Sequence, residues 1–197
     1  MSACTGVPLT LDEYVDGFER HHGVEGVGEL WKIERTQVFQ EEGNASCAAF
    51  LAGDRARSLA LIAERLPQLE QQHRAATAHG MVVGRVRVVE EPLDPYVLWE
   101  LTSQVQRAAL GEQIKVVDAA DLAGLEAGGP LPDLVGFDDA VVYFIHYTPD
   151  GVPTGATAAT DHQVAHWRQV YRSLHDAAEP VADYHARRVA PELPEAP

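Results

Sequence analysis

The chain has 197 residues, 46% of them apolar and 23% charged, which is the composition of an ordinary globular domain with a full core. The 30 acidic residues outnumber the 15 basic ones, so the net charge is −15 at pH 7. A field of that sign repels phosphate backbones, and we expect no direct nucleic-acid binding. No apolar stretch approaches the roughly 20 residues that span a bilayer. No basic region followed by an apolar run opens the chain, so we expect a cytoplasmic protein without membrane contact.

The first part of the chain predicts helices around one strand. The capping-box pattern at residues 10–13 begins a short helix that would bury four side chains, namely Leu11, Tyr14, Val15 and Phe18. Alternation from Leu30 to Phe39 predicts a strand. A short helix over 45–52 follows, and a longer one runs from Asp54 towards Gly80. Because Pro67 falls inside that pattern, we expect a kink or break near Arg65.

The middle of the chain predicts a strand, a helix and a second strand. Val82–Val89 is rich in valine, as β-strands are. Asp94 is a good helix cap and Pro95 a good first helical residue. Ile114–Val117 is the second strand. This order indicates a right-handed βαβ unit with parallel strands.

The last third predicts a hairpin and an amphipathic helix. The hairpin joins Leu134–Phe137 to 140–147. The helix begins at Asp161, has a late kink at Pro180, and carries an apolar stripe of Val164, Trp167, Tyr171, Leu174, Ala178 and Val181. We therefore expect one α/β (α+β) domain over residues 1–188, with a mixed sheet, a central parallel βαβ unit, an antiparallel hairpin and flanking helices. Residues 189–197 are predicted to be a disordered tail.

Two arginines carry the main functional hypothesis. Arg85 and Arg87 share one face of the valine-rich strand, and together with Glu34, Glu100 and Tyr96 they predict a polar pocket for a small ligand. The alternative is that the arginines pair with glutamates or aromatic rings and only stabilise the fold. Within this hypothesis, Arg87 is the ligand contact because it lies nearer the carboxyl end of the strand, and Arg85 is structural.

The sequence gives only weak indications of a catalytic signature, a metal site or a reactive cysteine. The common phosphate-loop, serine-hydrolase and metalloprotease signatures are absent. His162 and His166 are spaced as a chelating pair, but two histidines beside a capping Asp161 do not define a site, so we expect no metal and no cofactor. Cys47 is followed by apolar residues, which favours a buried role over a reactive thiol.

Several segments resemble an uncharacterised family of actinobacterial proteins, a domain of unknown function often encoded beside small helix-turn-helix regulators. They are LWKIERTQVFQEEGNASCAAFLAGD, GRVRVVEEPLDPYVLWEL, RAALGEQIKVV and LPDLVGFDDAVVYFIHYTPDG. The resemblance implies a cytoplasmic protein with a regulatory role. In layout only, the chain is also similar to one lobe of phospholipase D-like domains. The H-x-K-x-x-x-x-D motif of that group is missing, because Thr148 stands where lysine is required, so the likeness implies that the catalysis is lost.

Two functional hypotheses remain. The first is a non-catalytic accessory or regulatory protein that binds a partner protein or a small effector. The second is a small cytoplasmic enzyme that acts on a polar small molecule at the Arg/Glu pocket. A pocket with convergent Arg, Glu and Tyr would favour a ligand site, and a flat apolar patch on the last helix would favour a partner.

Overall fold

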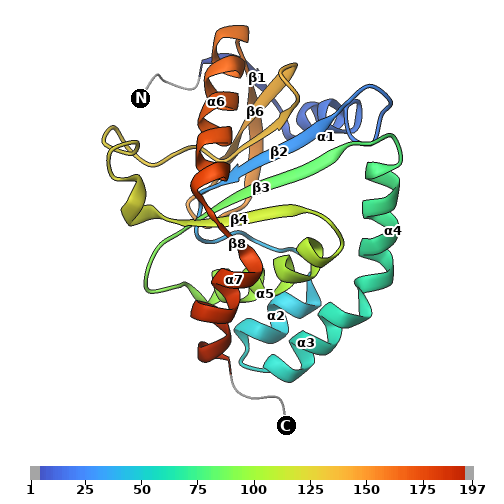
Figure 1. Cartoon of the computed structure of the whole chain (residues 1–197), viewed down its shortest axis with the longest axis vertical. Helices are drawn as coiled ribbons and strands as arrows, with labels where there is room; N and C mark the ends of the chain where they lie inside the picture. Colours follow the sequence, from blue (N-terminus) through green and yellow to red (C-terminus); the bar gives the residue numbers. More distant parts are fainter. Residues whose placement is uncertain (1–4, 194–197) are drawn as a thin grey trace.

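A computed structural model describes residues 5–193, which form one mixed β-sheet with helices on both faces (Figure 1). The strands are β1 (Gly6–Leu9), β2 (Glu29–Glu34), β3 (Val82–Val89), β4 (Gln113–Asp118), β5 (Leu134–Phe137), β6 (Val141–Tyr147), β7 (Pro153–Ala159) and β8 (Glu179–Pro180). Their order in the sheet is β1-β7-β6-β5-β2-β3-β4-β8. The central strands β2, β3 and β4 are parallel, and all other neighbours are antiparallel.

The helices are α1 (Leu11–Glu19), α2 (Ala45–Leu51), α3 (Arg55–Glu64), α4 (Leu66–Thr77), α5 (Pro95–Ala109), α6 (Asp161–Ala177) and α7 (Val181–Tyr184). In Figure 1, α6 crosses the front of the sheet, and α4 runs along the right side towards β2 and β3. Helices α1 and α5 pack on the face opposite α6. None of the helices within residues 5–193 is long and apolar enough to cross a membrane.

The predicted βαβ unit and the mixed sheet are confirmed. Strands β3 and β4 are adjacent and parallel, and α5 joins them. The Asp94 side chain caps α5 by accepting the Tyr96 backbone N–H at 2.8 Å, and Pro95 occupies the first turn, as the local sequence indicated. The hairpin of β5 and β6 and the break at Arg65 between α3 and α4 also match the sequence predictions.

Strand β2 is shorter than predicted. It ends at Glu34, whereas the alternation predicted a strand to Phe39. The backbone amides of Arg35 and Thr36 donate to the carboxylate of Asp133, at 2.6 and 3.1 Å, instead of continuing the ladder. A side chain distant in the sequence therefore sets the end of this strand.

Strands β1 and β7 were not predicted. Strand β7 reads Pro-Thr-Gly-Ala-Thr-Ala-Ala and lacks the large β-branched and aromatic residues that usually signal a strand. It pairs with both β6 and β1, so sheet neighbours supply the stability that its own sequence does not. In α1, the expected burial of Leu11 and Val15 is wrong: they are 36% and 43% exposed.

The C-terminal segment also differs from expectation. Helix α6 ends at Ala177, and Glu179–Pro180 forms the edge strand β8 beside β4, where a late kink was expected. The chain continues through α7 and a π-helical turn to Val189, which is fully buried, and through a short turn over Ala190–Glu192. The rest of the predicted tail, residues 194–197, lies outside the described part.

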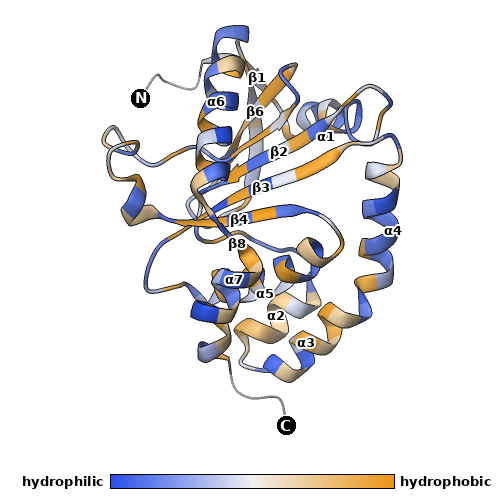
Figure 2. Cartoon of the chain, viewed as in Figure 1, coloured by the Kyte–Doolittle hydropathy of each residue, from blue (hydrophilic) through white to orange (hydrophobic). Residues whose placement is uncertain are grey.

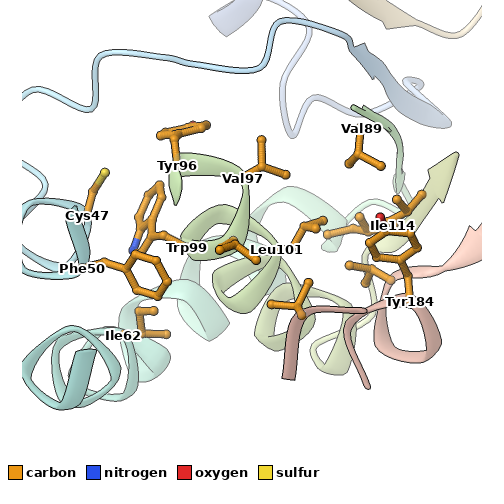
Figure 3. Packing of buried hydrophobic residues seen from close by; sticks show 14 residues of the cluster. Cys47, Phe50, Ile62, Val89, Tyr96, Val97, Trp99, Leu101, Ile114 and Tyr184 are labelled. Carbon is orange, nitrogen blue, oxygen red and sulfur yellow. The ribbon is translucent and has the colours of Figure 1, made fainter. Parts of the chain in front are cut away.

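Three apolar clusters form the core, and alternation along the strands assigns them to the two faces. Trp31 and Val86 pack under α6 with the first four residues of its predicted stripe, whereas Val181, the last residue of that stripe, lies outside α6 and packs on the other face. On the other face one cluster lies beneath α1, and a second lies between α5, α2 and α7. Figure 3 shows Trp99 of α5 between Phe50 and Tyr96 in this second cluster. Figure 2 shows hydrophobic and hydrophilic residues alternating along the central strands, and the outer side of α4 largely hydrophilic.

Candidate functional site

Charged side chains separate the two apolar clusters on the α5 face of the sheet. In the parallel register, Lys32 lies opposite Arg85, and Glu34 lies opposite Arg87. Side chains two residues apart share a face, so all four project from the same side. The predicted alternation therefore brings together the arginines and Glu34, as the sequence suggested.

Arg87 is enclosed by protein atoms and is 0% exposed. Its Nε donates to Oε2 of Glu100 at 2.7 Å, and its Nη1 donates to the backbone oxygens of Glu34 and Val88 at 3.1 and 3.0 Å. Phe39 lies over the guanidinium, 5.9 Å from ring centre to Cζ. Three hydrogen bonds and a covering ring make Arg87 a link between β2, β3 and α5, and its role in ligand binding stays a prediction.

Arg85 lies nearer the start of β3 and pairs with the carboxylate of Glu34. Its Nη2 is also 3.9 Å from Oε2 of Glu112. Its buried Nε has no hydrogen-bond partner within residues 5–193. Gln104 of α5 bridges the two halves of the cluster, donating to Glu100 at 3.1 Å and to Glu34 at 3.4 Å.

The two carboxylates of the cluster have opposite pKa shifts. Burial raises the pKa of Glu100 to about 7, because Arg87 only partly offsets the loss of water and the charge of Glu34 adds to the increase. Burial also acts on Glu34, but Arg85 and Lys32 outweigh it and lower the pKa of that carboxyl. Glu34 is therefore ionised at neutral pH, and Glu100 exchanges its proton near neutrality.

Tyr96, the remaining residue of the predicted site, is placed beside the cluster. Its hydroxyl donates to Oε1 of Glu41 at 3.0 Å, and its ring packs on Trp99 and Phe39. Burial raises its pKa, and the charges of Glu100 and Glu41 add to that effect. It makes no hydrogen bond to Arg85 or Arg87 among the described residues, so its role in ligand binding stays a prediction.

A cavity of about 250 Å³ lies over the beginning of β2 and β3, on the Arg85 side of the cluster. Helix α1, helix α4 and the end of α5 form its walls. Its lining combines apolar and charged side chains: Phe18, His22, Leu30, Lys32, Gln72, His73, Ala76, Val83, Arg85, Arg107 and Glu112. Arg107 and Glu112 pair with each other at 3.1 Å. The lining thus holds three cations and one carboxylate, within a protein of net charge −15.

Lys32 is the residue that sequence reasoning missed. It makes no hydrogen bond or ion pair with any described residue, and its Nζ lies 5.9 Å from the ring centre of Phe18. Burial lowers its pKa to about 8, and the nearby charge of Arg85 acts in the same direction. A signal was available, because the chain contains only two lysines, and alternation places Lys32 on the same side as Glu34.

Other residues considered for chemistry have structural surroundings. Cys47 is buried, and burial raises the pKa of its thiol to about 11. His166 stacks edge-on against Trp167. Across residues 5–193, no three His, Cys, Asp or Glu side chains are grouped so that they could hold a metal ion.

Of the comparisons with known proteins, one finds a match. The family model described as "Domain of unknown function (DUF6879)" matches residues 18–186. The chain belongs to the DUF6879 family. The match extends from α1 to the π-helical turn after α7, so the DUF6879 region includes every residue of the charged cluster and of the cavity. No curated protein and no solved structure matches the chain significantly.

Proposed function

We propose that this protein is a cytoplasmic, non-catalytic accessory or regulatory protein that binds a small anionic effector in the cavity over β2 and β3. The observation that carries the proposal is the Lys32 ammonium, which lines the cavity and forms no direct ion pair with any described residue, while Arg85 and Arg107 are paired. Lys32 is half-buried, and a charge partly removed from water is costly unless it is paired. An anionic ligand would supply the missing partner.

The regulatory part of the proposal rests on sequence resemblance. The resemblance to an actinobacterial family encoded beside helix-turn-helix regulators implies a regulator as partner, and we propose that the effector alters their association. The charge of −15 argues against direct contact with DNA. The layout likeness to phospholipase D-like lobes supports a non-catalytic role, since the residues of that catalysis are missing.

Thermal unfolding with a panel of small anions tests the effector site. Acetate, citrate and inorganic phosphate are added to the parent protein and to Lys32→Met and Lys115→Met. A ligand at one hundred times its Kd stabilises by about 2.7 kcal/mol, which raises the Tm of a domain this size by roughly 5–11 °C. We expect this increase in the parent and in Lys115→Met, and none in Lys32→Met. Equal increases in all three proteins would contradict the proposal.

The alternative is a small enzyme that acts on a polar molecule at the Arg/Glu cluster. One observation favours it: the pKa of Glu100 lies near 7, where general acids and bases work best. Against it, Glu100 is only 8% exposed and bonded to Arg87 and Gln104. Turnover of a polar substrate that disappears in Glu100→Gln, with the fold retained, would establish the enzyme instead.

A further inference from the structure

We propose that Lys32 is an amine nucleophile that forms a reversible imine with a small aldehyde or ketone bearing an anionic group. This inference rests on the proposed function, because it specifies the ligand class of the same cavity and adds a covalent bond. The sequence contains only one other lysine, Lys115, so the chemistry of the two amines can be compared within one molecule.

The surroundings of Lys32 are those that activate a lysine. A neutral amine is needed for attack on a carbonyl, and both removal from water and nearby cations favour that form. Phe18 covers the ammonium, and Arg85 lies on the neighbouring strand in register with it. The pKa near 8 is consistent with this geometry. Lys115, by contrast, donates its Nζ to the backbone oxygen of His175 at 2.7 Å.

The reaction needs only groups in the cavity and water. The Lys32 nitrogen attacks the carbonyl carbon, a C–N bond forms, and the nitrogen loses its protons as the C=N bond develops. The carbonyl oxygen takes up two protons and leaves as water, so the balance is amine plus carbonyl to imine plus water, without oxidation or reduction. Glu112 and His73 line the cavity and can move these protons.

The lining of the cavity also favours a ligand that carries an anionic group beside its carbonyl. Arg85 Nε and His73 Nδ1 are buried and without hydrogen-bond partners among the described residues, and both belong to side chains of the lining. A carboxylate or phosphate would accept from these nitrogens and balance the positive lining. A volume of about 250 Å³ suits a small metabolite such as an oxo acid, rather than a nucleotide.

Reductive trapping tests the inference. The full chain is incubated with glyoxylate, an aldehyde with a carboxylate, at pH 7.5 with cyanoborohydride, and carboxymethylation of each lysine is measured by peptide mass spectrometry. An ordinary lysine is roughly 0.1% neutral at this pH and one with a pKa of about 8 roughly 25% neutral. We expect at least about tenfold more modification at Lys32 than at Lys115. Propionaldehyde, which lacks the anion, should modify Lys32 less, and excess acetate should protect it.

Two matched variants separate the possible results. Lys115→Arg should leave the labelling of Lys32 unchanged. Lys32→Arg keeps the positive charge but removes the amine, so it should yield no adduct in the cavity. If acetate and glyoxylate stabilise the parent while Lys32 is labelled no more than Lys115, the imine is refuted and the effector site stands. If neither anion binds and no selective label forms, both fall. Equal labelling by propionaldehyde would overturn the anionic ligand class.

Discussion

Replacing Arg87 with Met tests whether the enclosed arginine stabilises the fold. The substitution retains most of the side-chain volume but removes the donor to Glu100 at 2.7 Å and the two donors to backbone oxygens. Glu100 would remain buried without its cationic partner. Breaking one half of a buried pair costs about 3–5 kcal/mol, and that corresponds to roughly 6–20 °C in Tm for a domain of this size. We expect that loss at pH 8, where Glu100 is ionised in the parent.

The pH dependence gives a second check on the same pair. A carboxyl whose pKa is raised on folding takes up a proton in the folded state that the unfolded chain does not bind. Stability contributed by Glu100 therefore increases as the pH falls from about 7 towards 4.5. Without Arg87 the pKa of Glu100 rises further, so the deficit of Arg87→Met relative to the parent should shrink as the pH falls from alkaline values towards about 7. Below pH 7 both folded proteins bind the proton, and the deficit should stay constant.

Urea unfolding, followed by tryptophan fluorescence at several pH values, measures both effects. Arg74→Met is the control, because Arg74 pairs with Glu70 on the surface and should change stability by less than about 1 kcal/mol. Arg87→Met/Glu100→Gln should recover much of the loss, since the orphaned charge is gone. An Arg87→Met protein as stable as the parent at pH 8 would refute this structural role. It is the result expected if Arg87 binds a ligand, as the sequence predicted.

Three further predictions follow from single sites. Gly136→Ala should destabilise the protein by about 1–3 kcal/mol in urea unfolding, because a Cβ there would lie 2.2 Å from the ring of Trp31. Gly124→Ala, with open space around it, is the control and should be nearly neutral. Lys32→Met should be more stable than the parent at pH 7 by on the order of 3 kcal/mol. That advantage should fall as the pH rises from about 8 to 10.5, because the Lys32 amine is then neutral in the folded parent and still charged in the unfolded chain. A constant advantage would contradict the lowered pKa of Lys32. Cys47 should react with a thiol reagent at pH 7.5 only on unfolding, as monitored by site-resolved mass spectrometry, and rapid reaction of the native protein would refute its burial.

The local sequence determined those elements whose signals all agree. In the βαβ unit, a valine-rich strand, an Asp94 cap and a proline in the first helical turn indicate the same structure that packing then stabilises. The stripe of α6 and the break near Arg65 are determined in the same way, by a helical period and by Pro67. The grouping of Arg85 with Arg87 also follows from sequence, because alternation along a strand requires no knowledge of the fold.

The tertiary structure decided which of the two arginines is enclosed and which one lines a cavity. Alternation assigns a side chain to a face but does not say which helix covers it, so the sequence could not show that α5 encloses Arg87 while Arg85 borders a cavity. The lack of a direct ion pair for Lys32 within residues 5–193 is likewise a property of the packed chain, since α1 and α4 lie over β2 although they are separate from it in the sequence. Strand β7 is stabilised by its pairing with β1 and β6. Strand β2 ends where the next two backbone amides donate to Asp133, about a hundred residues away in the chain. Pairing between distant segments depends on the whole topology, so a local sequence pattern cannot determine it.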